Sequence, residues 1–339
     1  MKAARFYKKH QLLVEDIPAR EPGDCEVKIR IRFCGVCGTD VHIYEGDKGS
    51  AQVMPPVVLG HELSGDVVAV GKDVMRFKEG DRVSVDPNAY CGKCYYCAKG
   101  EKHLCENMVG LGTAADGGFA EYVTVREELV FPIAPNVSYE AAAMTEPLSC
   151  CLHGMDLTNV RLGDTVMIVG TGNIGLIMLQ LARHAGATTV VAVEPNAQRL
   201  EKARALGADV CIDPLHDDTD QVLRDHGVRY IDKVIDCAGR VDTAEYSVRY
   251  AGRGATVMLF GLTGPDDVMQ LKPFEVFQKE LTIKGSFVNP NAFERAGRLL
   301  ANGSVQVEDT IGYIVDLDDI NSVFEQRLYA KGGKVLIRM

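Results

Sequence analysis

Apolar segments alternate with segments of helical periodicity throughout the second half of the chain, and this alternation limits the fold more strictly than any other feature of the sequence. Strands that are apolar throughout, separated by helices, form a parallel sheet that helices cover on both faces. We therefore predict an α/β fold with a doubly wound parallel sheet. Its strands are predicted in TVMIVG at 165–170, TTVVAVE at 188–194, ADVCID at 208–213, KVIDCA at 233–238, ATVMLFG at 255–261 and LTIKGSF at 281–287.

The first 145 or so residues follow a different pattern, with short segments that alternate apolar and polar residues. In the segment 26–33, Val27, Ile29 and Ile31 alternate with charged residues, which is the period of a half-buried strand. Gly and Pro residues separate several similar segments. The pattern predicts a β-rich first domain, and the strand-like end KVLIRM is expected to rejoin it.

These two patterns divide the chain into three segments. We expect a β-rich domain at 1–146, a doubly wound α/β domain at 147–288, and a return to the first domain at 289–339.

A glycine-rich turn follows the first strand of the predicted parallel sheet. In GTGNIG, Gly170, Gly172 and Gly175 have the GxGxxG spacing, and Asn173 and Ile174 open the following helix. The glycines permit a tight turn, close approach of the backbone to a pyrophosphate, and close packing of helix on strand. An ordinary glycine turn is the alternative, but the strand before it and the helix after it favour a dinucleotide site.

An acidic residue ends the next predicted strand. Glu194 lies nineteen residues after Gly175, where a carboxylate can bind both ribose hydroxyls of the adenosine and would repel a 2′-phosphate. We therefore predict NAD rather than NADP as the cofactor. Arg199 follows closely and either softens this preference or is a solvated helix residue.

Four cysteines occur together in CGKCYYCAKGEKHLC. Cys91, Cys94, Cys97 and Cys105 are separated by three, three and eight residues. Four thiolates form a closed tetrahedral zinc site, and CxxC pairs supply neighbouring ligands. A bacterial ferredoxin cluster would place its last cysteine four residues on, before a proline. The spacing therefore predicts a structural zinc site rather than an iron–sulfur cluster or unliganded thiols.

Several motifs together carry a family resemblance that extends along the whole chain. CGVCGTD at 34–40, GHE at 60–62, the four-cysteine segment, GFAEY at 118–122, EPLSC at 146–150 and GTGNIG occur in this order. The chain thereby resembles the zinc-dependent medium-chain alcohol dehydrogenases, and within them the polyol branch of sorbitol, butanediol and threonine dehydrogenases. The resemblance implies a Rossmann domain inserted in a β-rich, GroES-like catalytic domain.

The same resemblance implies a second, catalytic zinc ion, so that two are expected per chain. Its ligands would be Cys37 and His61, with Glu62 and Glu146 as further candidates. Glu146 stands where classical alcohol dehydrogenases have a cysteine, which favours the polyol branch. Whether Glu62, Glu146 or both contact the metal is left open, and a hydrogen bond to a ligand is the alternative role for each. Two adjacent carboxylates raise each other's pKa, so that Glu62 could also take part in proton transfer.

Residues that follow Cys37 are expected to support the catalysis. By resemblance, Thr39 and His42 would form a proton relay with the nicotinamide ribose, although His42 could equally cap a loop. Asp40 is expected to accept the N–H of His61, since metal-bound histidines generally have such a partner. Tyr44 is a weaker candidate for the wall of the substrate pocket.

Charge and composition limit the partners. The net charge of −10 and the pI near 5.4 argue against a nucleic acid or an anionic membrane, and we expect a small-molecule alcohol instead. We find no run of eighteen apolar residues and no signal-peptide pattern, and eleven cysteines suit a reducing compartment, so a cytoplasmic location is expected. The resemblance implies a homo-oligomer, with a tetramer favoured.

We therefore predict a zinc-dependent oxidoreductase that transfers hydride from a secondary alcohol of a polyol or small diol to NAD and yields the ketone. Oxidation of threonine or another amino alcohol is the alternative within enzymes, and the sequence EPLSC weighs against it. A non-catalytic zinc-and-nucleotide binding module is the alternative from another class.

Overall fold

The computed structural model describes residues 1–47 and 53–339. The contacts divide the chain into two compact units, and the first of them is discontinuous in sequence. It contains Met1–Ser149 together with Asn289–Met339, and the second contains Cys150–Val288.

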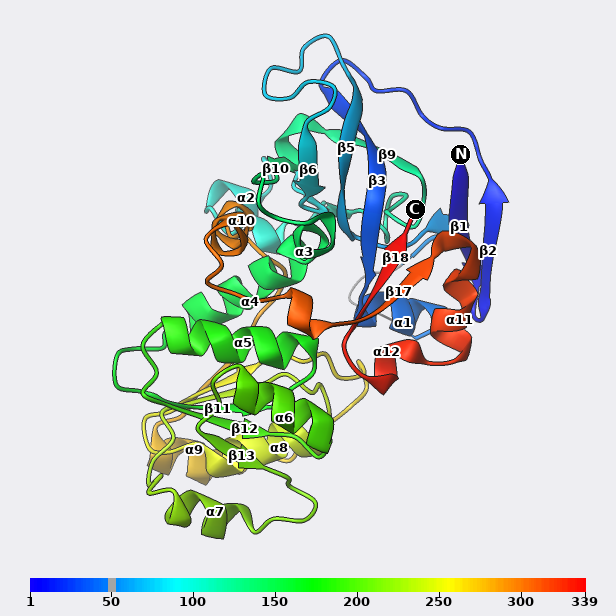
Figure 1. Cartoon of the computed structure of the whole chain (residues 1–339). Helices are drawn as coiled ribbons and strands as arrows, with labels where there is room; N and C mark the ends of the chain where they lie inside the picture. The colour runs from blue at the N-terminus through cyan, green and yellow to red at the C-terminus, as the bar shows by residue number, and fades with distance from the viewer. Residues whose placement is uncertain (48–52) are drawn as a thin grey trace. The chain divides into compact units, whose positions relative to one another are not determined.

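The largest sheet of the first unit contains strands from both of its segments. Its strands lie in the order β10 (Val130–Pro132), β6 (Arg82–Val85), β5 (Glu62–Val70), β3 (Glu26–Val36), β18 (Lys334–Arg338) and β17 (Ile311–Asp316), and β9 (Tyr122–Arg126) also pairs with β3. β18 runs antiparallel to β3 and lies beside it in Figure 1, where β18 is red and β3 is blue. The C-terminal segment KVLIRM therefore joins the sheet of the first unit, as predicted.

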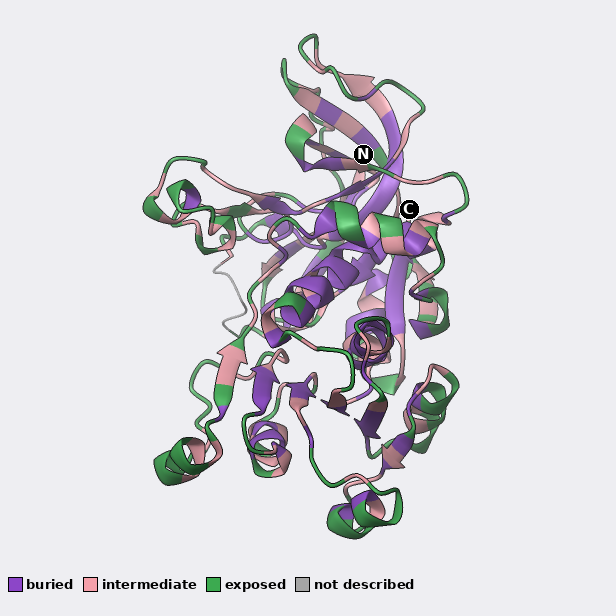
Figure 2. Cartoon of the chain, turned by 90° about the vertical axis from the view of Figure 1, so that its left-hand side faces the viewer, coloured by how far each residue is buried: buried purple, intermediate pink, exposed green. Residues whose placement is uncertain are grey.

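The alternation in β3 has the predicted consequence. Val27, Ile29 and Ile31 are at most 1% exposed, whereas Arg30 between them is exposed. The buried side chains belong to one apolar core that also includes Leu63 and Phe119. Figure 2 shows this buried interior in purple along the strands.

Smaller elements complete the first unit. Its other strands are β1 (Lys2–Lys8), β2 (Gln11–Asp16), β4 (Val57–Val58), β7 (Asn88–Ala89) and β8 (Val109–Gly110). Its helices are α1 (Gly38–Tyr44), α2 (Tyr95–Ala98), α3 (Tyr139–Ala143), α10 (Phe293–Ala301), α11 (Ile320–Glu325) and α12 (Leu328–Lys331), with 3-10 turns η1 (Lys102–Leu104), η2 (Glu127–Leu129), η3 (Glu308–Thr310) and η4 (Leu317–Asp319). α4 (Thr145–Thr158) begins in the first unit and ends in the second.

The second unit has the doubly wound parallel sheet that the sequence predicts. Its strands lie in the order β13 (Val210–Ile212), β12 (Thr189–Val193), β11 (Thr165–Val169), β14 (Lys233–Asp236), β15 (Thr256–Leu259) and β16 (Thr282–Gly285). All neighbouring pairs are parallel. The order reverses between β11 and β14, and ligands of such sheets bind at the carboxyl ends of the strands at this point.

Helices cover this sheet because its strands are apolar on both faces. Val166, Met167 and Ile168 of β11 are completely buried. Right-handed crossovers place α5 (Asn173–His184) and α6 (Ala197–Ala205) on one face and α8 (Val241–Tyr250) and α9 (Pro273–Lys279) on the other. α7 (Thr219–Asp225) follows β13. Among the described residues, no helix has the length and apolar character needed to cross a lipid bilayer.

Candidate metal centres and nucleotide site

Three potential metal ligands from two separate segments meet in the first unit. Cys37 is the N-cap residue of α1, His61 directly precedes β5, and Glu62 is the first residue of β5. One donor atom from each of the three lies within 4.8 Å of the others. In a tetrahedral zinc site the donors are roughly 3.5 Å apart, since zinc binds sulfur, nitrogen and oxygen at about 2.0–2.3 Å. The sulfur, nitrogen and oxygen donors therefore fit a zinc ion after small side-chain adjustments.

Asp40 links the two segments that carry these ligands. Its carboxylate is completely buried and accepts the backbone N–H of Cys37 at 2.8 Å and that of Gly60 at 3.1 Å. Burial raises the pKa of Asp40 above its ordinary value. The carboxylate thus holds the start of α1 against the turn that precedes His61.

The predicted hydrogen bond from His61 to Asp40 is not present in this geometry. Nδ1 of His61 lies 3.9 Å from Oδ1 of Asp40 and has no hydrogen-bond partner among the described residues. Gly60 has φ +86°, and a Cβ atom there would lie 2.6 Å from the ring of Phe119. This turn directs the N–H of Gly60, rather than the ring of His61, at the carboxylate.

The electrostatic surroundings of the three ligands favour a cation. Burial alone would lower the pKa of His61, but Cys37, Asp40 and Glu146 raise it well above its ordinary value. Glu146 is 7% exposed in the first turn of α4. A negative potential at a cluster of sulfur, nitrogen and oxygen donors is what a divalent cation requires.

Sequence reasoning missed one charged residue of this site. Lys334, the first residue of β18, is 6% exposed and donates a hydrogen bond of 2.5 Å to Oε1 of Glu62, which is 1% exposed. Burial lowers the pKa of Lys334, but Glu62, Cys37 and Glu146 raise it more, so that the amine stays protonated. A lysine at the start of an apolar C-terminal strand could have been noticed, but the sequence does not indicate its partner.

A glycine provides the space for this ion pair. Gly35 of β3 pairs with Leu336 of β18 on one side and with Glu62 of β5 on the other. A Cβ atom at Gly35 would overlap the carboxylate of Glu62 and would lie 2.8 Å from Cε of Lys334. The side chains of the two neighbouring strands therefore meet across β3.

Thr39, His42 and Tyr44 of α1, which were expected to support catalysis, differ from one another in their surroundings. Thr39 and His42 are both partly exposed, and Nδ1 of His42 lies 3.5 Å from Oδ2 of Asp47. Tyr44 is 6% exposed, and its ring is stacked on Phe324 with centroids 4.5 Å apart. Tyr44 therefore belongs to the apolar core of the first unit rather than to an open pocket wall.

The four cysteines of the segment 91–105 also meet. One sulfur from each of Cys91, Cys94, Cys97 and Cys105 lies within 4.8 Å of the others. Backbone N–H groups of Lys93 and Cys94 lower the pKa of Cys91 to about 6, whereas burial and the neighbouring thiols raise the pKa of Cys97 to about 12. Thiolates are the form that binds zinc, and four of them form a closed site.

The lobe that carries these cysteines has little apolar core. It extends from β7 through α2 and η1 to β8, and Cys97 is its one buried residue from Tyr90 to Gly110. Tyr95, Leu104 and Val109 are 64%, 41% and 45% exposed. So little buried surface cannot offset the entropy lost on ordering the lobe, which is the situation in which a structural metal contributes folding free energy.

The glycine-rich turn of the second unit has the geometry of a phosphate-binding loop. Gly170 follows β11 with φ +86°, and Gly172 is the N-cap residue of α5. A Cβ atom at Gly175 would overlap the carbonyl oxygen of Gly170, whereas one at Gly172 would meet no atom within 4 Å. Asn173 and Ile174 form the first turn of α5. The open side at Gly172 and the N-terminus of a twelve-residue helix suit a pyrophosphate.

Glu194 lies at the end of β12 and reaches back to this turn. It is 4% exposed, and its carboxylate accepts the backbone N–H of Thr171 at 2.9 Å and that of Asn196 at 3.1 Å. Arg199 of α6 has Nη1 3.9 Å from Oε1 of Glu194. The hydroxyl of Thr171 also donates to it at 3.5 Å, and a ribose hydroxyl of a nucleotide could take the remaining acceptor position or displace this long bond.

Two family models match the chain. The model "Alcohol dehydrogenase GroES-like domain" matches residues 23–135, and the model "Zinc-binding dehydrogenase" matches residues 173–302. The chain is 36% identical over 335 residues to a D-arabitol-phosphate dehydrogenase of Enterococcus avium, which covers 96% of this chain and 94% of the relative. It is 35% identical over 331 residues to a sorbitol dehydrogenase of Halalkalibacterium halodurans, with the same two coverages.

Solved structures agree with these matches. A zinc-binding dehydrogenase of Sinorhizobium meliloti 1021, bound to NADP, has a TM-score of 0.95 and 37% identity, and the match covers 100% of this chain and 99% of that one. The resemblance seen in the sequence is therefore confirmed. The chain belongs to the zinc-dependent medium-chain alcohol dehydrogenases, in the branch that contains the polyol dehydrogenases, and it is a dehydrogenase.

Proposed function

We propose that this enzyme oxidises a secondary alcohol of a polyol or small diol to the ketone, with NAD as the hydride acceptor and two zinc ions per chain. The meeting of Cys37, His61 and Glu62 within 4.8 Å, in a half-buried cluster where nearby anions raise the pKa of His61, is the observation that carries the proposal. The similarity to dehydrogenases of sorbitol and arabitol phosphate supports a polyhydric substrate.

The first unit supplies the groups for the alcohol. Zinc, when bound, supplies Lewis-acid stabilisation of the negative charge that develops on the alcohol oxygen, and the nicotinamide supplies the hydride acceptor. Cys37 and His61 are its proposed ligands, with Glu62 or Glu146 as the third, and Lys334 balances the charge of the additional carboxylate. Asp40 fixes the positions of the backbone at Cys37 and Gly60.

A proton must leave the alcohol as the hydride is transferred. We assign this transfer to Thr39 and His42 on α1. The side chain of His42 is 34% exposed, so it can exchange a proton with solvent. Groups in such roles typically contribute about a hundredfold to ten-thousandfold to the rate.

The second unit supplies the cofactor site. Gly170, Gly172 and Gly175, with Asn173 and Ile174, are the proposed pyrophosphate loop, because the helix N-terminus there favours an anion. The buried carboxylate of Glu194 favours the two ribose hydroxyls of NAD over a 2′-phosphate. Arg199 weakens this preference, since its guanidinium, 3.9 Å from the carboxylate of Glu194, could pair with a 2′-phosphate.

Cys91, Cys94, Cys97 and Cys105 are the proposed ligands of the structural zinc. With four protein ligands no coordination position is open, so that this site serves the fold of its lobe rather than the reaction.

The assembly and location of the enzyme are also proposals. α9 carries Phe274 and Phe277, which are 71% and 79% exposed, and Val268 nearby is 81% exposed. Such surface suits association with another copy, and we propose a homo-oligomer, with a tetramer favoured. None of the eleven cysteines, all of which lie among the described residues, forms a disulfide bond, which suits a reducing compartment such as the cytoplasm. Light scattering on the purified enzyme tests the assembly, and a monomer would contradict it.

One experiment tests the proposed reaction. Purified zinc-loaded enzyme is assayed with polyols, diols, sugar phosphates and threonine, each with NAD and with NADP, and its zinc content is measured. We expect two zinc ions per chain and NAD reduction with polyols or diols. Preferential turnover of threonine would identify an amino-alcohol dehydrogenase, a clear preference for NADP would refute the role of Glu194, and one zinc ion without turnover would favour the binding-module alternative.

A further inference from the structure

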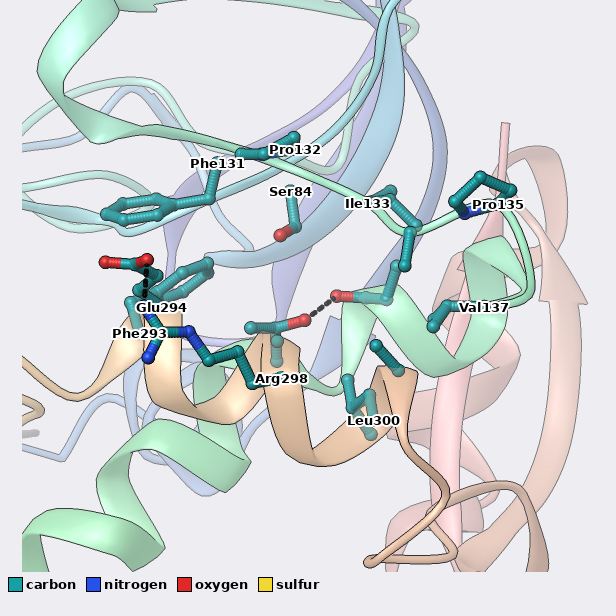
Figure 3. Close-up of a pocket in the computed structure, with 15 residues that line it drawn as sticks. Ser84, Phe131, Pro132, Ile133, Pro135, Val137, Phe293, Glu294, Arg298 and Leu300 are labelled. Carbon is teal, nitrogen blue, oxygen red and sulfur yellow. Dashed lines mark hydrogen bonds and ion pairs between the residues drawn. The ribbon is translucent and has the colours of Figure 1, made fainter.

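The first unit contains a pocket that is separate from the proposed metal and nucleotide residues. It has a volume of about 420 Å3, which is within the range of small-molecule sites. Figure 3 shows it between the segment 131–137 and helix α10. Its walls are apolar and include Phe131, Ile133, Val137, Phe293 and Leu300. None of the residues proposed above for zinc or NAD lines it.

The hydroxyl of a buried residue points into this pocket. Ser84 of β6 is 3% exposed, and Figure 3 shows its oxygen directed into the space between Ile133 and Phe131 on one side and α10 on the other. No described residue forms a hydrogen bond with this hydroxyl. The oxygen is reached by water through the pocket, and a ligand that displaces this water has to replace its hydrogen bond. The hydroxyl of Ser84 is therefore available to a hydrogen-bonding group of a molecule inside the pocket.

A glycine keeps the opposite wall open. Gly297 is the fifth of the nine residues of α10, where glycine is the least favourable residue other than proline. Its φ is outside the left-handed region, and a Cβ atom there would meet no atom within 4 Å. Neither backbone conformation nor packing within the chain therefore requires glycine at this position. Its effect is to leave space in the pocket.

The charges and the rim of the pocket limit its occupant. Glu294 and Arg298 are the only charged residues among those that line it, and they form an ion pair with each other, 2.5 Å apart. No unpaired charge is available for an ionic ligand. The large exposed apolar side chains of the described residues include none that line this pocket. The pocket therefore lacks the apolar rim that docking of another protein would need. A small molecule that enters the pocket fits these features better than a protein surface does.

We propose that this pocket binds a small neutral molecule with an apolar body and one hydrogen-bonding group, which pairs with the hydroxyl of Ser84. A cavity of about 150 Å3 holds benzene, so this pocket holds a body of about 15 non-hydrogen atoms. None of its lining residues is proposed here for zinc, NAD or proton transfer, so its occupation does not depend on the proposed reaction.

Equilibrium dialysis of the full zinc-loaded chain with 2-naphthol and with naphthalene tests this site, because the two probes differ only by a hydroxyl. We expect about one bound 2-naphthol per chain. Ser84→Ala should lower the affinity for 2-naphthol about fivefold, the effect of one hydrogen bond, and should leave the affinity for naphthalene unchanged. A saturating concentration of NADH should leave the affinity for both probes unchanged.

Filling the pocket provides the decisive variant. Gly297→Leu should weaken the binding of both probes at least tenfold. Gly297→Ala is the control, because it adds only one methyl group but raises the helix propensity by a similar amount, and it should change both affinities less than twofold. Circular dichroism checks that the variants fold. If Gly297→Leu does not fold, Ala301→Leu, one helical turn further along α10, is used in its place. Equal affinity in the wild type and the filled variant, displacement by NADH, or no binding of either probe would overturn the proposal.

Discussion

Lys334 and Glu62 form a buried ion pair that crosses a strand, with Nζ of Lys334 2.5 Å from Oε1 of Glu62. Each side chain comes from a strand adjacent to β3, and they meet over Gly35. A zinc ion with the thiolate of Cys37 and the carboxylate of Glu62 would be neutral, and Glu146 adds a negative charge that acts on both His61 and Lys334. The ammonium group of Lys334 offsets this additional charge.

Lys334→Met should destabilise the first unit, because it leaves the carboxylate of Glu62 buried without its cation. Removal of one partner of a buried pair typically lowers the free energy of unfolding by about 3–5 kcal/mol. Glu62→Gln in the same chain should recover most of this loss. Urea unfolding of the two single variants and the double variant gives the coupling between them. A double variant as unstable as the sum of the single ones would contradict a direct interaction.

Gly35→Ala should separate the pair, since the added methyl group would occupy the position of the carboxylate. We expect a loss of about 1–3 kcal/mol in the free energy of unfolding, as for other overpacked sites, together with reduced turnover. Gly285→Ala is the matched control, because a Cβ atom in that strand meets no atom within 4 Å. If the two variants unfold at the same urea concentration, the space at Gly35 is not needed by the pair.

Cys37→Ser should nearly abolish turnover and lower the zinc content from two ions per chain to one, since a serine hydroxyl is a poor substitute for a thiolate ligand. Cys25→Ser, at an exposed free cysteine, is the control and should change neither value. His42→Ala should instead retain both ions, slow the reaction and shift its pH profile. Full activity of Cys37→Ser would refute the catalytic assignment.

Cys94→Ser should also remove one zinc ion, but its first effect should be on stability. The lobe has too little buried apolar surface to stay ordered without its metal. Limited proteolysis should therefore cut the variant between residues 91 and 110 faster than it cuts the remainder of the chain. Mass spectrometry of the fragments locates the cut. Resistance equal to that of the wild type would show that the lobe is stable without the fourth thiolate.

Asp86 predicts a pH dependence that is independent of the metal ligands. Burial raises the pKa of this carboxyl from 3.8 to about 6 in the folded chain, although it accepts hydrogen bonds from Asn88 and Asn289. The folded chain therefore holds the proton more tightly than the unfolded one. Protonated Asp86 therefore stabilises the folded chain at low pH, and this contribution is lost as the pH rises from about 4 to about 6. Above that range the free energy of unfolding is lower by about 3 kcal/mol.

Asp86→Asn removes this ionisation. Its stability relative to the wild type should rise by about 2 kcal/mol between pH 4.5 and pH 7, measured by urea unfolding. The zinc ligands ionise equally in both proteins, so their contribution cancels in the difference. A constant difference across this pH range would mean that Asp86 has an ordinary pKa in the folded chain.

The local pattern of apolar and polar residues was sufficient to predict those strands and helices in which this pattern has a regular period. The central strands of the parallel sheet are apolar throughout, and β3 alternates from Val27 to Ile31, so both could be predicted from a few neighbouring residues. The hairpin of β1 and β2 was not predicted, because its turn at Lys9 and His10 lacks the usual turn residues, and His10 itself has φ +59°.

Contacts between distant residues could not be predicted in the same way. Lys334 and Glu62 are 272 residues apart, and their pairing depends on strands on both sides of Gly35. The expected partner of His61 was wrong for a related reason, since the turn at Gly60 gives the carboxylate of Asp40 to the backbone instead. Motif spacing predicted which residues lie close together in the metal site, but not which of their atoms form hydrogen bonds with one another.

The link that Asp40 makes between Cys37 and Gly60 has a consequence for how newly made enzyme matures. Hydrogen bonds from the backbone N–H groups of Cys37 and Gly60 to the carboxylate of Asp40 hold these two segments together without a metal, so the inner site is preassembled. The cysteine lobe has no comparable scaffold and must fold around its ion. In a cell short of zinc, the supply of metal would therefore decide how long each molecule survives proteolysis as well as how fast it works.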